Sequence, residues 1–198
     1  MDYLQLHSID YLYHMAHIDN LASIVENGLL SHYEAYRQGL IKADISDLNV
    51  QNIRRDKIDR FYNRPLHRYV PLYFSPRNPM LYKRLEIQED IIILGIDPQI
   101  LSEINIFFTN GNAAASETIF YRGIHMLGQL PWDSIRAKSW TDIEDGKRIK
   151  CAEVLVYPKI EPKWIQKVFC YSDKHREKII AAKQGTSIIG KVKRDLYF

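Results

Sequence analysis

Residues 150–156, with the sequence Lys-Cys-Ala-Glu-Val-Leu-Val, predict a short strand buried inside a sheet. Alternate strand residues point to opposite sides, so one face carries Ala152, Val154 and Val156 and the other carries Cys151, Glu153 and Leu155. A carboxylate in the middle of such a strand is costly to bury unless another group pairs with it or uses it. Glu153 is therefore expected either as a structural residue, at the sheet surface or in an internal ion pair, or as a catalytic carboxylate that the strand holds rigidly.

The rest of the chain predicts a compact α+β fold, because short strands and short helices follow one another without regular alternation. Its 198 residues suit a single domain covering 1–198. Residues 90–96 are almost continuously apolar and predict a central strand, whereas Pro71 suggests an edge position for the strand at 69–74. Residues 31–49 predict a polar, partly helical excursion. Further strands are expected at 10–16, 106–109, 164–171 and 187–190, and helices between Asn20 and Gly28, at 50–64, from Pro79 and at 172–183.

Residues 54–84 form a basic segment interleaved with aromatic residues. The formal net charge of the whole chain is only +3, so positive charge is concentrated here. This composition is typical of a site for unpaired nucleic acid, whose phosphates bind cations and whose bases stack on rings. A solvated basic face is the structural alternative. The basic residues are Arg54, Arg55, Lys57, Arg60, Arg64, His67, Arg68, Arg77, Lys83 and Arg84, and the aromatic ones are Phe61, Tyr62, Tyr69, Tyr73, Phe74 and Tyr82.

Several familiar chemistries are not expected from this sequence. Neither G-x-G-x-x-G nor G-K-[ST] occurs, which argues against a Gly-rich phosphate loop. His14 and His17 straddle a strand-to-helix junction, and Cys151 and Cys170 lie in apolar stretches, so no metal site is predicted. There is no secretion signal and no apolar run long enough to span a membrane, which predicts a cytoplasmic protein.

Polar residues at predicted strand and helix ends follow one another in a distinctive order, namely His14, Asn20, Arg55, Tyr73 and Glu153. With the segments around them, they resemble the DarT family of bacterial DNA ADP-ribosyltransferase toxins. The matching segments are Tyr13-His-Met-Ala-His-Ile-Asp-Asn-Leu21 with Gly28-Leu29, Arg54-Arg55, His67-x-Tyr-Val-Pro-x-Tyr-Phe-x-Pro-Arg-x-Pro-Met-Leu-Tyr82, Phe108-Thr-Asn-Gly-Asn-Ala-Ala114, Ala152-Glu-Val-Leu-Val156 and Cys170-Tyr-Ser172. They cover nearly the whole chain in the family's order.

The resemblance implies the ADP-ribosyltransferase fold, a split and mostly antiparallel β core with NAD+ in the cleft between its halves. It implies transfer of ADP-ribose from NAD+ to a base of single-stranded DNA, with release of nicotinamide and without a metal. Glu153 is the expected catalytic carboxylate. Arg55 is expected to hold the pyrophosphate or help activate the base, and is preferred to Arg54 by its distance from the Pro-containing strand, although the sequence does not separate the two. The other implied contacts are His14, Met15, Ala16, Asn20 and Tyr73 for NAD+, and Arg54, Arg77, Met80, Tyr82, Asn110 and Asn112 for DNA.

Residues 110–112, Asn-Gly-Asn, bear on the target base. Thymine-modifying relatives typically carry Asp-x-His after Phe-Thr, so this loop favours the guanine-modifying branch, with thymine as the alternative. The implied partners are single-stranded DNA and an antitoxin that resembles a NADAR-type or macrodomain ADP-ribosyl hydrolase, in a toxin–antitoxin or phage-defence system. The chain itself is expected to be a monomer. Two other functions stay open: transfer to RNA or protein, and a non-enzymatic single-stranded nucleic-acid-binding domain, against which Glu153 argues.

Overall fold

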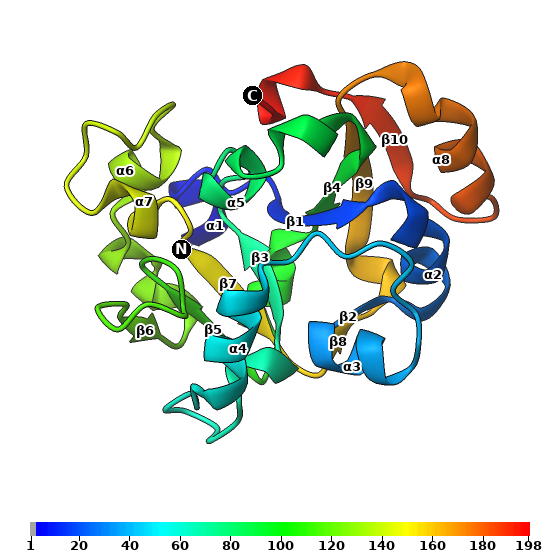
Figure 1. Cartoon of the computed structure of the whole chain (residues 1–198). Coiled ribbons are helices and arrows are strands. Elements are labelled where there is room, and N and C mark those ends of the chain that lie inside the picture. Colours follow the sequence, from blue (N-terminus) through cyan, green and yellow to red (C-terminus); the bar gives the residue numbers. More distant parts are fainter. Residues whose placement is uncertain (1–2) are drawn as a thin grey trace.

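The computed structural model describes residues 3–198, which form an eight-stranded sheet and a two-stranded sheet with short helices packed around them (Figure 1). The strands are β1 Leu12–His17, β2 Leu29–Leu30, β3 Val70–Tyr73, β4 Ile91–Ile96, β5 Ile106–Thr109, β6 Phe120–Tyr121, β7 Glu153–Val156, β8 Lys159–Ile160, β9 Ile165–Cys170 and β10 Ile189–Val192. The α-helices are α1 Tyr3–Leu6, α2 Leu21–Asn27, α3 His32–Arg37, α4 Leu48–Asp56, α5 Pro79–Tyr82, α6 Trp132–Arg136, α7 Gly146–Ile149 and α8 Arg176–Ala182. Within the described residues, no helix is long and apolar enough to cross a membrane.

The eight-stranded sheet consists of two halves that meet along β1 and β3. Its order is β10-β9-β4-β1-β3-β7-β5-β6, and its neighbouring strands are antiparallel except for β10 and β9. The ladders next to the split are longer, with six residue pairs between β1 and β4 and four between β3 and β7. Between the halves, Tyr13 and Tyr73 form the one registered pair. A split, mostly antiparallel core is what the family resemblance implied.

Pro71 contributes to this split. The prediction of an edge strand was wrong in strand order, because β3 lies between β1 and β7. A proline has no N–H to donate to a ladder. Its carbonyl oxygen accepts a 2.8 Å hydrogen bond from the ring of His14 instead of one from a backbone amide of β1. Pro71 pairs with Leu155 of β7 but lies at the edge of its half-sheet on the other side, where backbone pairing with β1 stops.

One face of the sheet carries a continuous apolar core, while the opposite face is divided. Alternate residues of the strands, such as Leu94 of β4 and Val154 of β7, point into the continuous core beneath α2 and α8. The other face has one cluster around Ile93 and a separate one around Phe107 and Leu155. The gap between these two clusters lies over β3 and the start of β7, and it is the place where a site can form without interrupting the main core.

Two predicted helix boundaries are confirmed by their local chemistry. α2 ends at Gly28, which has a φ of +82°, and a Cβ at this position would lie 2.5 Å from the carbonyl oxygen of Ile160. Glycine is therefore the residue that this turn requires. α5 begins after Asn78, whose side-chain oxygen accepts hydrogen bonds from the backbone N–H groups of Met80 and Leu81.

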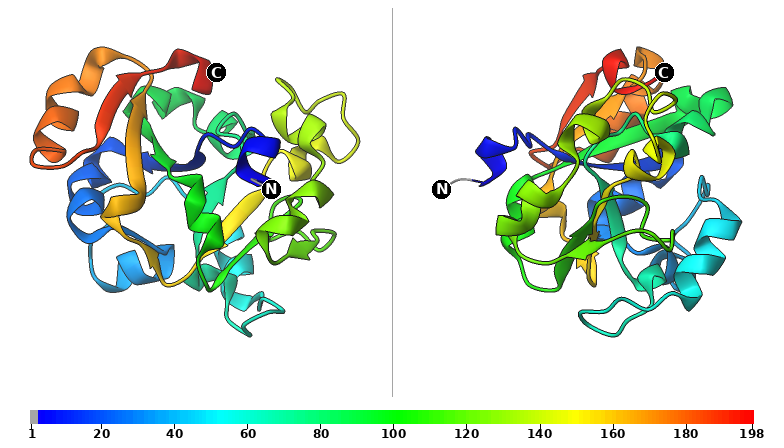
Figure 2. Two further views of the ribbon diagram at one scale, coloured as in Figure 1. Left: turned by 180° about the vertical axis from the view of Figure 1, so that it is seen from behind. Right: turned by 90° about the vertical axis from the view of Figure 1, so that its left-hand side faces the viewer.

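The helix expected at 50–64 is shorter than predicted and ends at Asp56. The reason is Asp59, whose buried carboxylate accepts hydrogen bonds from the backbone N–H groups of Phe61, Tyr62 and Arg64. These bonds stabilise a loop, because they satisfy amides that a helix would otherwise pair. Figure 2 shows this loop projecting from the rest of the chain.

Phe107→Ala is expected to lower the free energy of unfolding by about 3–5 kcal/mol, measured by urea unfolding. Phe107 is fully buried and its ring contacts those of Phe61, Tyr69 and Phe120. Ile104→Ala is the control, because Ile104 is 80% exposed, and it should change stability by less than about 0.5 kcal/mol. Equal effects of the two substitutions would contradict the placement of Phe107 in the core.

Candidate active site

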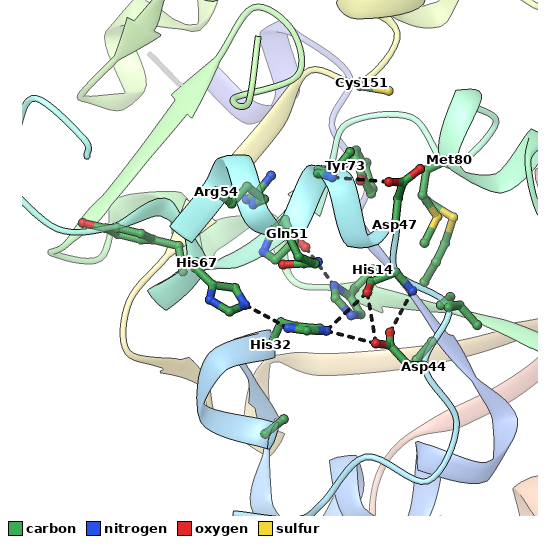
Figure 3. A pocket seen from close by; sticks show the side chains of 18 of the residues that line it. His14, His32, Asp44, Asp47, Gln51, Arg54, His67, Tyr73, Met80 and Cys151 are labelled. Atoms are coloured by element: carbon green, nitrogen blue, oxygen red, sulfur yellow. Dashed lines mark hydrogen bonds and ion pairs between the residues drawn. The ribbon is translucent and has the colours of Figure 1, made fainter. Parts of the chain in front are cut away.

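A cavity of about 530 Å³ lies on the divided face of the sheet (Figure 3). This volume is in the range of small-molecule binding sites. Its walls come from β1, β2, β3, α2, α3, α4, α5, α7 and the segment between α3 and α4. The excursion predicted at 31–49 therefore forms one side of the cavity, as α3 followed by an irregular segment.

A buried ion pair between Arg54 and Glu153 lies at the base of this cavity. Arg54 Nη1 is 3.1 Å from both carboxylate oxygens of Glu153. Arg54 is 5% exposed and lines the cavity, whereas Glu153 is 1% exposed and lies beneath it. Burial opposes the charge of the guanidinium, but the attraction of Glu153 outweighs it and raises the pKa of Arg54. Of the two structural settings considered for Glu153, the sheet surface is wrong and the internal ion pair is confirmed.

The loop after β5 holds Glu153 from another side. The backbone N–H of Ala113 donates a 2.7 Å hydrogen bond to Oε1 of Glu153. The Thr109 hydroxyl accepts a hydrogen bond from the Glu153 backbone N–H and lies 2.7 Å from the carbonyl oxygen of Gly111. A guanidinium and a backbone amide thus fix the carboxylate through charge-assisted hydrogen bonds.

The structure places Arg54, rather than Arg55, in the site. Successive residues of an α-helix are rotated by about 100°, so two neighbours cannot both face the sheet. Arg55 is exposed and is not among the described residues that line the cavity. Nη2 of Arg54 is buried and has no hydrogen-bond partner within residues 3–198, which leaves a donor for a substrate oxygen. The preference for Arg55 is therefore corrected to Arg54.

His14 presents a hydrogen-bond acceptor to the cavity. Its Nδ1 lies 2.8 Å from the carbonyl oxygen of Pro71, which can only accept, so Nδ1 carries the proton. Burial lowers the pKa of His14 and favours the neutral ring, whose Nε2 then has a free lone pair. Met15 and Ala16, which were predicted with His14, also line the cavity.

Asn20 lines the cavity as well, but its side-chain amide is already partly used. Its Nδ2 donates to the carbonyl oxygen of Ala43 at 2.7 Å, and its Oδ1 accepts from the N–H groups of Lys42 and Ala43. These bonds tie the segment between α3 and α4 to the residues that follow β1. They use one of the two Nδ2 hydrogens, so the direct contact with NAD+ stays a prediction.

Tyr73, Met80 and Cys151 complete the part of the wall nearest Glu153. Tyr73 pairs in register with Glu153, and burial followed by this negative charge raises the pKa of its phenol. The same two causes raise the pKa of Cys151 to about 12. A thiol with so high a pKa stays protonated and is a poor nucleophile. Cys151 is therefore a buried wall residue, as the sequence indicated.

A pair of histidines in the cavity wall was missed by the sequence reasoning. His32 Nδ1 lies 2.9 Å from His67 Nε2, and His32 Nε2 lies 3.1 Å from Asp44 Oδ2 (Figure 3). Asp44 also accepts a hydrogen bond from the hydroxyl of Tyr36. Burial, followed by the charges of His32 and the nearby arginines, lowers the pKa of His67 to about 4. No motif or periodicity joins these residues, because they meet only when α3 folds against the segment before β3.

The residues predicted to contact DNA are distributed around the cavity. Met80 and Asn112 line it, and Tyr82 is half exposed on the same short helix as Met80. Asn110 and Arg77 are not among the described residues of its wall. No group of three or more His, Cys, Asp or Glu side chains in the described part of the chain is arranged to hold a metal ion.

The split antiparallel sheet, the cavity at the split and the strand-borne glutamate beneath it agree with the ADP-ribosyltransferase fold that the family resemblance implies. Solved structures of DarT from Thermus sp. 2.9 have this fold. Its complex with ADP-ribosylated ssDNA matches with a TM-score of 0.87 and 28% identity, covering 96% of this chain and 97% of that one. Its complex with NAD+ matches with a TM-score of 0.82 and 28% identity, covering 96% and 98%. The predicted fold class is confirmed.

The chain belongs to the DarT family, whose model, described as "ssDNA thymidine ADP-ribosyltransferase, DarT", matches residues 13–198. A DNA ADP-ribosyl transferase of Thermus sp. (strain 2.9) is 32% identical over 180 residues, 85% of each chain. A fusion of a DNA ADP-ribosyl transferase with a DNA ADP-ribosyl glycohydrolase, from Thermosipho africanus (strain H17ap60334), is 36% identical over 163 residues, which are 80% of this chain but only 42% of the fusion protein.

Membership of this family confirms the predicted enzyme class, an NAD+-dependent DNA ADP-ribosyltransferase. The guanine-modifying branch stays a prediction, since the family model is described by thymidine. The individual roles assigned to residues of the site are taken up below as proposals.

The lowered pKa of His67 predicts a specific pH dependence of stability. In the unfolded chain His67 titrates near its ordinary value of about 6.5, whereas its folded pKa is about 4. Between these values the unfolded state binds more protons, so stability falls as the pH falls from 6.5 towards 4. His67→Gln should lose less stability than wild type over this interval in urea unfolding. If wild type and His67→Gln lose the same stability over this pH interval, the pKa of His67 is not lowered in the folded protein.

Proposed function

We propose that this chain transfers ADP-ribose from NAD+ to a thymine base of single-stranded DNA and releases nicotinamide. The observation that carries the proposal is the buried Arg54–Glu153 pair beneath a cavity, with a donor on Arg54 that has no partner among residues 3–198. His14 adds a free acceptor in the wall. Among relatives, DarT of Thermus sp. 2.9 binds NAD+ and ADP-ribosylated ssDNA. We assign residues 1–198 to one transferase domain.

Glu153 is the catalytic carboxylate of this proposal. Breaking the bond between ribose and nicotinamide develops positive charge on the ribose, and a fixed carboxylate stabilises that charge more in the transition state than in the ground state. As the ring nitrogen of thymine bonds to the ribose carbon, its proton passes to Glu153 and nicotinamide leaves as a neutral molecule. The rigid setting on β7 and the hydrogen bond from the Ala113 amide keep the carboxylate in place for this step.

Arg54 links substrate binding to the carboxylate. Its Nη1 contacts both oxygens of Glu153, which does not line the cavity. A pyrophosphate or base oxygen that binds the unpartnered Nη2 pulls the guanidinium towards the cavity and uncovers Glu153. The Nε2 atom of His14 accepts a hydrogen bond from a ribose hydroxyl. Tyr73 and Met80 pack against the nicotinamide or the target base.

Thymine is preferred to guanine as the acceptor. The description of the family model supports thymine. The guanine interpretation depended on Asn110 and Asn112, whose side-chain oxygens are used inside the loop. Asn110 Oδ1 accepts from the N–H of Ile119 and from Arg148, and Asn112 Oδ1 accepts from the N–H of Ala114. Side chains engaged in this way give no reason to assign a base, so guanine remains as an outcome of the test.

The proposal extends to a partner and a place of action. The Thermosipho relative carries a DNA ADP-ribosyl glycohydrolase in the same chain. We propose that a macrodomain-type or NADAR-type hydrolase that removes ADP-ribose from DNA is the antitoxin of this chain, in a toxin–antitoxin or phage-defence system. Because the reaction needs both NAD+ and DNA, the proposed location is the cytoplasm.

Mass spectrometry of four oligonucleotides, each lacking one base, tests the proposed function. After incubation with this chain and NAD+, an ADP-ribose adduct is expected on every oligonucleotide except the one without thymine. Loss of the adduct only without guanine would overturn the thymine assignment and keep the enzyme. Consumption of NAD+ without any DNA adduct would contradict transfer of ADP-ribose to DNA. RNA and protein would then be the acceptors to test.

Glu153→Gln is expected to lower the rate of transfer by about 10²–10⁴-fold, because it removes the group that accepts the proton and stabilises the charge. Glu103→Gln is the matched control, since Glu103 is exposed and outside the cavity wall, and should keep the wild-type rate. Circular dichroism should first show that Glu153→Gln is folded. A folded Glu153→Gln variant with the wild-type rate would refute the catalytic assignment.

A further inference from the structure

Three aromatic rings from separate parts of the chain meet beside the cavity. They are Tyr82 of α5, Trp140 in the segment before α7, and Phe198 at the end of the chain labelled C in Figure 1. Their ring centroids lie 5.4–5.8 Å apart with interplanar angles of 80–90°. Arg77 lies over Phe198 at 4.8 Å from the ring centroid. We call these four residues the aromatic platform.

The aromatic platform is continuous with the wall of the cavity. The one-turn helix α5 that carries Tyr82 also carries Met80, and the next residue is Lys83, both of which line the cavity. On the other side, a Cβ at Gly146 would lie 2.5 Å from the carbonyl oxygen of Trp140, so the two backbones are in close contact. Lys147, which follows Gly146, lines the cavity too.

The platform has a buried polar group without a partner in residues 3–198, namely Nε of Arg77. Tyr82 is the exposed ring of the platform, with an exposed fraction of 52%. Single exposed rings are common on protein surfaces. Three rings and an arginine from separate segments at the rim of one cavity are a different case, because together they offer a stacking surface and donors.

The charges nearby indicate how an anionic strand would lie. Lys83 and Lys147 line the cavity, but Lys83 is paired with Asp47 at 3.0 Å, and Asp145 lines the cavity as well. The exposed Asp142 and Glu144 lie in the segment that follows Trp140. A phosphate backbone is attracted by Lys147 and Arg77 and repelled by these carboxylates. A strand that passes along α5, between the platform and the cavity, would lie between the two cations.

We propose that the aromatic platform stacks an unpaired base next to the base that enters the cavity, with Tyr82 as its exposed ring and Arg77 as its phosphate contact. Aromatic rings bind bases of any sequence through their faces. The platform thus anchors the strand in the correct position while the target base reaches Glu153. This inference rests on the proposed function, because it requires single-stranded DNA as the acceptor.

The test compares oligonucleotides that carry one thymine and a single abasic site on one or the other side of it. For wild type, the abasic site at one of these two positions should lower kcat/KM for transfer by about tenfold, the factor that about 1.4 kcal/mol of stacking provides. Tyr82→Leu keeps the apolar bulk but removes the ring. The kcat/KM of this variant on the intact oligonucleotide should be about tenfold below that of wild type. The abasic site should not lower it further.

Tyr82→Phe is the conservative control, since it keeps the ring and should keep the response of wild type to the abasic site. If neither abasic site lowers kcat/KM of wild type, the proposed role of the platform is wrong, whereas the proposed function is unaffected. A Tyr82→Leu variant that responds to the abasic site as strongly as wild type would also overturn the proposed role of the platform. If wild type fails to modify the intact oligonucleotide, the proposed function fails first, so the two failures are distinguishable.

Discussion

The ion pair between Arg54 and Glu153 is the contact on which the site depends. Removing either charge from water costs several kcal/mol, and a buried pair is often no more stabilising than apolar residues of the same volume. The pair is therefore a poor way to stabilise a fold. It lies beneath a cavity, and one guanidinium nitrogen has no partner in the described part of the chain, which is the arrangement expected of groups that serve a reaction.

The two faces of the sheet have different roles, so the fold can contain a buried ion pair without losing its main core. One face has an uninterrupted core, while the other is free to open between two smaller clusters. The segment that forms the outer wall is tied down by long-range hydrogen bonds. Arg84 donates to the carbonyl oxygens of Ile45 and Ser46, and Asn20 holds Lys42 and Ala43. The cavity thus keeps its shape through polar contacts around a stable sheet.

The parts of this structure that sequence could predict are those decided by local chemistry. Apolar runs and alternation located β4 and β7, and Gly28 and Asn78 marked helix boundaries because their own backbone or side chain makes the cap. What could not be predicted depends on packing between distant segments. Arg54 and Arg55 are chemically identical neighbours, and only the placement of α4 in the folded chain decides which one faces Glu153. Pro71 was interpreted as an edge residue, but the sequence could not show that the edge lies inside a split sheet.

The most direct test is the transfer rate of the double variant Arg54→Met/Glu153→Gln. Methionine replaces the buried charge with an apolar chain, and glutamine keeps an acceptor for the Ala113 amide. Replacing both partners should preserve folding better than removing either one alone. The account predicts a folded double variant, verified by urea unfolding, that transfers no ADP-ribose to single-stranded DNA. A folded double variant that still modifies DNA at a rate near that of wild type would show that the pair is structural, and would contradict the account.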